Sequence, residues 1–266
     1  MYLIRYLALI TILSFLTGSA WAAGEADLTS KMSGDFEAGD LHYGLSNGYG
    51  TWNGVFLRGE LHVDPINTWN AEIVNLREFG DQGTLFVIGN THDFGPEWYT
   101  NTSVSSSNGG LFLPQLRLDA AINKKWLKRL NLITTAGIIA IKSKDVHVDN
   151  GLLLATSYYF EQPYILEGGI IFNHSNPGAV NSTAKYMALT YGAEKHRFLS
   201  LRYGFGEEAY QIVGGNNLLS DFNSNTLTAT WRQWVQKDWG FQLRAESYHN
   251  PYYDRNGGEI GLFWDM

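Results

Sequence analysis

The chain has 266 residues and a formal net charge of −7, with 17% charged and 14% aromatic residues. The negative charge argues against a nucleic-acid-binding protein, whose binding surface would be basic. The chain contains no cysteine, which excludes disulfides, thiolate metal sites, a cysteine nucleophile and a lipoprotein acylation site. Few charges, many aromatic residues and 29 glycines favour strands over helices.

The first residues have the organisation of a secretory signal peptide. Arg5 precedes an apolar run from Tyr6 to Leu16, and the triplet Ala20-Trp21-Ala22 follows. These are the charged, hydrophobic and cleavage regions of such a signal. A membrane anchor would need about 20 apolar residues, which is more than this run offers. We therefore predict a signal peptide over 1–22 and an exported domain over 23–266, in a Gram-negative cell envelope.

Apolar and polar side chains then alternate, which indicates strands with one apolar and one polar face. Val55 and Leu57, for example, alternate with Arg58 and Glu60. The same alternation occurs at 115–122, 226–232 and 241–247. In chain order, the predicted strands cover 39–49, 51–63, 68–80, 82–93, 95–106, 110–122, 129–142, 146–160, 163–174, 181–193, 196–212, 222–236, 239–250 and 257–266. We expect about 14 strands, with 12 or 16 as alternatives.

The connections between these strands alternate in length. Short ones such as Asp64-Pro65 and Gly95-Pro96 alternate with longer ones rich in Gly, Asn and Ser, such as 103–110, 173–182 and 207–221. Short inner turns and longer outer loops are typical of an outer-membrane β-barrel. A soluble β-sandwich shares the strand pattern but has no reason to separate its connections in this way. We therefore predict an all-β fold, a transmembrane antiparallel β-barrel forming one domain in the cell outer membrane.

Aromatic residues support this prediction. Several tryptophans fall near the inner ends of strands, where an interfacial girdle would lie: Trp69, Trp98, Trp126, Trp234, Trp239 and Trp264. The last strand alternates Ile260, Leu262, Trp264 and Met266, as in the closing strand that barrel-assembly machinery recognises. Such strands usually end in Phe or Trp, so Met266 is a departure.

A family resemblance rests on diffuse motifs. They are the turn and strand Gly80-Asp81-Gln82-Gly83-Thr84-Leu85-Phe86, the segment Lys185 to Tyr191, the early strand with Arg58 and Glu60, and the closing strand. With these, the exported chain resembles the YaiO-like family of outer-membrane β-barrel proteins. The resemblance implies a barrel fold and an outer-membrane location. It supplies no catalytic residues, and the proximity of some members to exopolysaccharide systems is an association only.

Charged residues on the polar strand faces are the candidate functional residues. An Arg facing lipid would cost about 2 to 4 kcal/mol at the membrane midplane, so we expect them to face the lumen. They are Arg58, Glu60, His62, Arg117, Asp119, Arg202, Arg232, Arg244 and Glu246. They would either line a channel or fill a sealed interior with salt bridges. Both remain open, because barrels of about 8 strands fill themselves whereas those of 16 to 18 leave a channel.

Other chemistry has weaker support. The histidines lack the spacing of a transition-metal site and no nucleophile motif occurs, so we expect no metal, no cofactor and no enzyme activity. Ser200, Ser247 and His249 are compatible with a lipid-modifying or lipopolysaccharide-modifying site at the rim. Three tyrosines of the last outer loop would serve as girdle residues or stack on sugars: Tyr248, Tyr252 and Tyr253.

The predicted function is a narrow channel, or an export or assembly component, for polar solutes or polysaccharide. The alternatives are a sealed structural barrel, a lipid-modifying enzyme at the rim and a soluble periplasmic lectin. The expected partners are outer-membrane lipid and lipopolysaccharide, the barrel-assembly machinery during biogenesis, and a polysaccharide or small polar solute. No nucleic acid is expected.

Overall fold

The computed structural model describes residues 32–213 and 217–266, and the predicted signal peptide over 1–22 lies outside them. Fourteen strands follow one another: β1 (Ser33–Leu45), β2 (Thr51–Asp64), β3 (Asn67–Glu78), β4 (Asp81–Asp93), β5 (Trp98–Gly109), β6 (Leu116–Trp126), β7 (Leu132–Lys142), β8 (Val148–Tyr159), β9 (Tyr164–Asn176), β10 (Val180–Ala193), β11 (Arg197–Val213), β12 (Asn217–Gln236), β13 (Trp239–His249) and β14 (Asp254–Asp265). In this part of the chain, no helix is long and apolar enough to cross a membrane.

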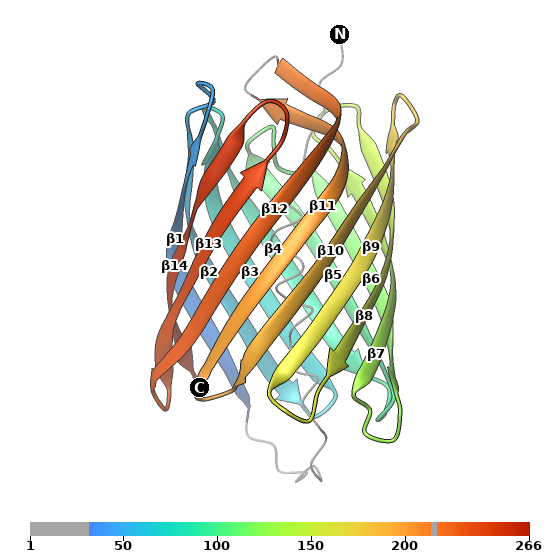
Figure 1. Cartoon of the computed structure of the whole chain (residues 1–266), viewed down its shortest axis with the longest axis vertical. Helices are drawn as coiled ribbons and strands as arrows, with labels where there is room; N and C mark the ends of the chain where they lie inside the picture. Colours follow the sequence, from blue (N-terminus) through green and yellow to red (C-terminus); the bar gives the residue numbers. More distant parts are fainter. Residues whose placement is uncertain (1–31, 214–216) are drawn as a thin grey trace.

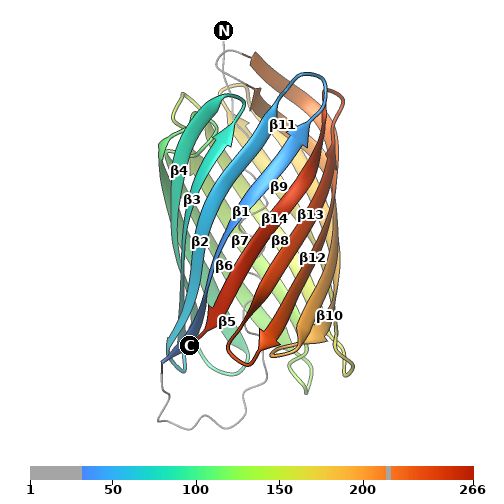
Figure 2. The same ribbon diagram turned by 90° about the vertical axis from the view of Figure 1, so that its left-hand side faces the viewer.

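The strands form one closed antiparallel barrel (Figure 1). Each strand pairs with its sequence neighbours, and β1 pairs with β14 from Asp35–Asp265 to Leu45–Arg255. The predicted fold and the strand number of 14 are confirmed. The strands tilt around the barrel, as closure requires (Figure 2). We call the end where β1 begins and β14 ends the inner rim, and the opposite end the outer rim.

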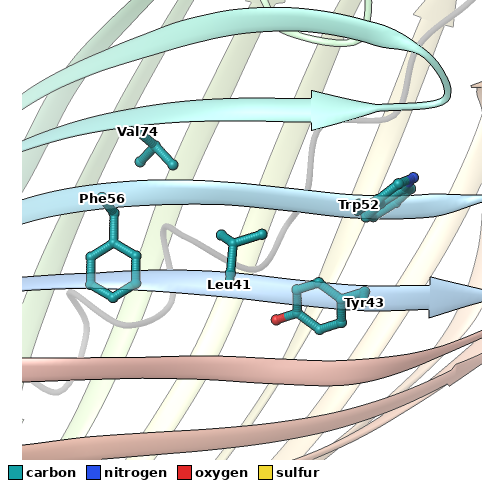
Figure 3. Packing of buried hydrophobic residues seen from close by; sticks show 5 residues of the cluster. All are labelled: Leu41, Tyr43, Trp52, Phe56 and Val74. Carbon is teal, nitrogen blue, oxygen red and sulfur yellow. The ribbon is translucent and has the colours of Figure 1, made fainter.

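The two faces of the strands differ as the alternation predicted. On β2 and β3, for example, Val55, Leu57 and Ile73 point outward and are 47% to 60% exposed. The residues that alternate with these along each strand point into the barrel. Part of the interior is filled by an apolar cluster from β1, β2 and β3 (Figure 3). Its members are Leu41, Tyr43, Trp52, Phe56 and Val74. The exposed apolar face is the one that contacts lipid in an outer-membrane barrel.

Several predicted boundaries are wrong. The strand predicted at 39–49 begins at Ser33, because pairing with β2 already starts at Ser33 and pairing with β14 at Asp35. The loop predicted over 207–221 is mostly strand, since β11 continues to Val213 and β12 starts at Asn217. Gly, Asn and Ser favour loops in solution, but here the backbone hydrogen-bond ladder continues through them beyond the other strands.

A third error lies between β5 and β6. The strand predicted over 110–122 begins only at Leu116, because the residues before it form a loop. In this loop Phe112 and Leu113 are buried against Leu85 and Val87 of β4. These β4 side chains point into the barrel, so the loop folds inward at the outer rim.

The predicted tryptophan girdle is partly present. The side chains of Trp69, Trp98, Trp126 and Trp264 are exposed at the inner end of the barrel. Trp264 stacks on Phe36 of β1, with ring centroids 5.0 Å apart. Trp234 departs from the prediction, because it points into the barrel and packs edge-on against Phe263. Its neighbour Val235 occupies the exposed face instead.

Candidate functional site

Side chains of opposite charge meet inside the barrel, across strands that are not neighbours. At the centre, Arg58 of β2 donates to Glu72 of β3 at 2.7 Å and to Glu259 of β14 at 3.2 Å. Strand β1 separates β2 from β14, so the second contact can form only on the concave side of the wall. Arg244 of β13 joins the same group, 3.6 Å from Glu259 and 3.1 Å from Glu246.

The group continues toward the outer rim through Arg255 of β14. Its guanidinium lies 2.6 Å from Glu246 and is buried. The same guanidinium stacks over the rings of Trp52 at 4.2 Å and Tyr248 at 4.6 Å. These rings stabilise a cation through their π-faces. Tyr248 in turn donates to Glu208 of β11 at 2.9 Å, which extends the polar chain around the wall.

Toward the inner rim, Arg232 of β12 takes the corresponding position. It pairs with Asp35 and lies 3.3 Å from Glu37, both on β1. Its guanidinium also stacks over Phe263 at 3.6 Å. Gln242 of β13 donates to Glu37 at 3.2 Å. Strands β13 and β14 lie between β12 and β1, so these contacts also bridge the concave side.

We call this ladder the charged wall. It contains four arginines and five carboxylates from β1, β2, β3, β12, β13 and β14: Asp35, Glu37, Arg58, Glu72, Arg232, Arg244, Glu246, Arg255 and Glu259. The side chains are therefore nearly balanced in charge. Three polar atoms of the wall, Oε2 of Glu72 and Nε of Arg244 and Arg255, are buried without a hydrogen-bond partner among the described residues.

On the opposite side of the interior, many inward side chains are smaller and fewer of them are charged. Its inward positions on β5, β8, β9 and β10 include small residues: Ser103, Ser105, Ala155, Gly169 and Ala188. Two further arginines face inward on this side. Arg117 of β6 forms a local pair with Asp119 at 2.8 Å. Arg202 of β11 lies 3.7 Å above the ring of Tyr186. The interior thus contains both polar and apolar side chains, and most of its ion pairs lie in the charged wall.

All nine predicted lumen residues lie on the inward-facing register of their strands, but they do not form one site. Arg58, Arg232, Arg244 and Glu246 belong to the charged wall. The remaining five form two separate pairs and a single arginine: Arg117 with Asp119 on β6, Glu60 with His62 at the inner end of β2, and Arg202 on β11. The imidazole of His62 lies 3.3 Å from the carboxylate of Glu60.

The sequence-based prediction did not include five members of the charged wall: Asp35, Glu37, Glu72, Arg255 and Glu259. The signal for Glu259 was available, since it alternates with the outward Ile260 and Leu262. The inward position of Glu72 could not be recognised from the sequence, because its inward neighbours on β3, Val74 and Leu76, are apolar. Its strand therefore lacks a clean polar face.

The outer rim is covered by aromatic side chains. The β11–β12 hairpin, the longest in the barrel, rises past the other strands and bends over this end (Figure 1). Phe222 of this hairpin packs with Tyr248 and Tyr253, and Tyr253 meets Tyr49 with ring centroids 5.1 Å apart. We call Tyr49, Phe79, Phe222, Tyr248 and Tyr253 the aromatic cap. Together with the inward loop of Phe112 and Leu113, the cap narrows the outer opening.

The rim tyrosines therefore differ from the prediction. Tyr252 is exposed, but Tyr248 and Tyr253 are buried in the cap and do not present their faces to solvent. Gln211 donates to the hydroxyl of Tyr253. Burial raises the pKa of Tyr253, which keeps its phenol neutral in this turn. Tyr248 and Tyr253 therefore pack in the aromatic cap at the outer rim.

The three candidate enzyme residues do not share one face of the barrel. Ser200 faces inward on β11 and accepts a hydrogen bond from Thr190 at 2.9 Å. Ser247 and His249 lie on the outward face of β13, and His249 contacts Asp254 at 2.6 Å in an exposed position. In residues 32–213 and 217–266, no three His, Asp or Glu side chains are grouped to hold a metal ion.

Comparison with known proteins supports the same architecture. A family model described as the YaiO membrane beta barrel domain matches residues 34–211. A search of curated proteins found no match.

Among solved structures, an anion-selective porin from Comamonas acidovorans is similar with 8% identity and a TM-score of 0.50, over 89% of this chain and 99% of that one. A bacterial polysaccharide outer membrane secretin has 6% identity and a TM-score of 0.58, over 88% and 98%. The CymD monoaromatic hydrocarbon channel has 6% identity and a TM-score of 0.57, over 89% and 88%. At such low identities, the structural similarity shows a shared fold alone.

Proposed function

Because the chain belongs to the YaiO family of membrane β-barrels, as the sequence resemblance predicted, we propose that it is a narrow passage for polar solutes across the outer membrane. The observation that carries this proposal is the charged wall. It follows the interior from Arg232 near the inner rim to Arg255 near the outer rim. We propose transport and no enzymatic activity, since the candidate residues are divided between the two faces of the barrel, with Ser200 inward and Ser247 and His249 outward.

If these side chains only filled a sealed interior, we would expect every buried polar atom to have a hydrogen-bond partner in the protein, because buried unpaired polar atoms cost free energy. The charged wall leaves polar atoms of Glu72, Arg244 and Arg255 without protein partners. Ordered water buried within the wall would supply these partners. The four arginines and five carboxylates of the wall offer hydrogen-bond donors and acceptors to neutral polar solutes such as sugars.

The fold is shared with several kinds of passage. One structural neighbour is described as a polysaccharide secretin, and others as a porin and a hydrocarbon channel. A saccharide chain presents alternating hydroxyl groups and apolar ring faces. The interior offers carboxylates and guanidinium groups as hydrogen-bond partners for the hydroxyl groups. We therefore place saccharides first among the candidate solutes.

Planar-bilayer conductance of the refolded protein tests the proposal. Its control is a cap variant, Phe112→Ala with Phe222→Ala, in which both outer obstructions lose their rings. Heat-modifiable gel mobility first shows that each protein is folded. We expect small ohmic steps from the native protein and larger steps from the cap variant. If neither folded protein gave conductance steps, the chain would be a sealed structural barrel and the proposal would be rejected.

A further inference from the structure

Two polar side chains lie on the outward face of β1, within the lipid-facing band. Asp40 and His42 are both exposed and alternate with the inward Leu41. Asp40 is paired across the sheet with Val55 and Ile260, which are 60% and 51% exposed. It lies four residues above Phe36, whose ring belongs to the inner aromatic girdle. The carboxylate is thus well inside the apolar band.

This placement is costly for a monomer surrounded by lipid. Among residues 32–213 and 217–266, neither Asp40 nor His42 has an ion-pair or side-chain hydrogen-bond partner. Lys185 also faces outward, on β10, but its long side chain can reach toward the headgroups. The short side chain of Asp40 cannot. An acidic group held in lipid is expected to have a partner within the membrane.

A hollow of about 740 Å³ lies beside these residues on the same outer face. Its base is a row of small side chains that continues from His42 through Gly258 and Ala245 to Ala229 on β14, β13 and β12. Larger apolar side chains border the row, on positions paired in register with Asp40: Ile260, Leu243 and Trp231. Figure 2 shows this face of the barrel, with β1 between β2 and β14.

We infer that a second copy of this chain occupies the hollow, in a dimer whose two-fold axis is normal to the membrane and passes close to Leu41. In such an isologous interface, the same patch meets itself. Asp40 of one copy then faces His42 of the other, and the contact is repeated by symmetry. Each copy therefore supplies a donor to Asp40 and an acceptor to His42 of the other copy.

The shapes on the two sides of β1 complement each other under the same symmetry. Barrel strands tilt by about 35° to 45°, so moving sideways by one strand changes the height by roughly one residue. This brings Val55, on the β2 side, to the height of Gly258, on the β14 side. Across the two-fold axis, the exposed Val55 of one copy meets Gly258 of the other. Leu57 likewise meets Ala245 at the base of the hollow.

Disulfide cross-linking tests this arrangement, since the native chain has no cysteine. In a Leu57→Cys/Ala245→Cys variant, β1 and β14 separate the two positions within one copy, but the positions are adjacent across the proposed interface. We expect this variant to form a covalent dimer in outer membranes. Each single variant should stay monomeric on a denaturing gel. Ile122→Cys/Leu154→Cys, two outward positions on β6 and β8, is the control for random collision.

The dimer should also respond to its polar and apolar contacts. Mass measurement in detergent by light scattering should show a dimer for the native chain. Asp40→Asn and Ala245→Leu should each weaken it by about tenfold or more. Ala136→Leu, which changes the same residue type on the outward face of β7, should leave it unchanged. Heat-modifiable mobility shows that each variant is folded.

Three outcomes would overturn the inference. The first is a folded native protein that is monomeric in detergent and gives no more cross-linked dimer than the control pair. The second is a cross-link from the Leu57→Cys/Ala245→Cys variant to another protein, which would identify a different occupant. The third is an Asp40→Asn variant that dimerises as well as the native chain. None of these outcomes depends on whether the lumen conducts.

Discussion

At the residue scale, the charged wall combines two roles. Arg58 bridges Glu72 and Glu259, and so links β3 to β14 across the seam where the barrel closes. Glu72 is almost entirely buried. Removing one partner of a buried ion pair leaves an uncompensated charge, whereas an exposed pair contributes little. Breaking a contact of the wall should therefore destabilise the barrel as well as change its interior potential.

Replacing Arg58 tests the structural role. Arg58→Met should lower the free energy of unfolding by about 2 to 5 kcal/mol, because Glu72 and Glu259 lose their shared cation. Arg129→Met is the matched control, since Arg129 pairs with Glu161 in an exposed inner turn. That change should cost under about 1 kcal/mol. Urea unfolding from lipid vesicles measures both values, and equal losses would contradict a buried, coupled wall.

Reversing the charge of Arg232 tests the electrostatic role. Arg232→Glu would place three carboxylates together near the inner rim, with Asp35 and Glu37. The variant should shift ion selectivity toward cations by a few-fold, as rings of acidic side chains do in cation channels. Lys128→Glu makes the same charge change in an exposed inner turn outside the lumen. The reversal potential in a salt gradient should shift for Arg232→Glu and remain unchanged for Lys128→Glu.

At the element scale, the inward and outward faces could be predicted because the side-chain period of a strand is two. That period sufficed to place Arg58, Arg117 and Arg244 on inward-facing registers. The strand ends could not be predicted in the same way. They depend on how far the ladder with a neighbour continues, as between β11 and β12, and on loops that fold inward, as at Phe112. Both are long-range contacts that local composition does not encode.

The bridges across the interior were also beyond prediction. Arg232 and Glu37 are far apart in sequence and meet only because the closed barrel brings β12 toward β1. The same closure turns Tyr253 from a rim residue into part of the cap. A strand pattern fixes which face a residue occupies, whereas its partner depends on barrel size and register.

Two adjacent alanines on β6 provide a direct test of the register. Ala120 faces outward and Ala121 faces inward, opposite Asn101 and Gly137. Ala120→Arg should lower the stability of the inserted barrel by about 2 to 4 kcal/mol, because its charge would lie in the apolar band. Ala121→Arg should cost under about 1 kcal/mol, since its charge enters the polar interior. Equal losses in a vesicle-folding titration would show that the register of β6 is shifted by one residue.

At the scale of the whole molecule, the two proposals concern opposite surfaces of the same strands. Arg58 and Glu259 line the interior, while Val55 and Gly258 lie on or beside the outward patch. Each copy in the proposed dimer would keep its own closed barrel, because the contact uses only outward side chains. Dimerisation and conduction should therefore be separable by mutation.

This separation predicts the form of the current traces. If native dimers insert into a planar bilayer as units, conductance should rise in pairs of equal steps, one for each lumen. Asp40→Asn should instead insert as single steps of the same size, because Asp40 lies outside the lumen. The Arg232→Glu variant should keep the paired steps and change only their selectivity. Paired steps in Asp40→Asn would show that the pairing has another cause, and an altered step size would show that the outer face of β1 shapes the passage.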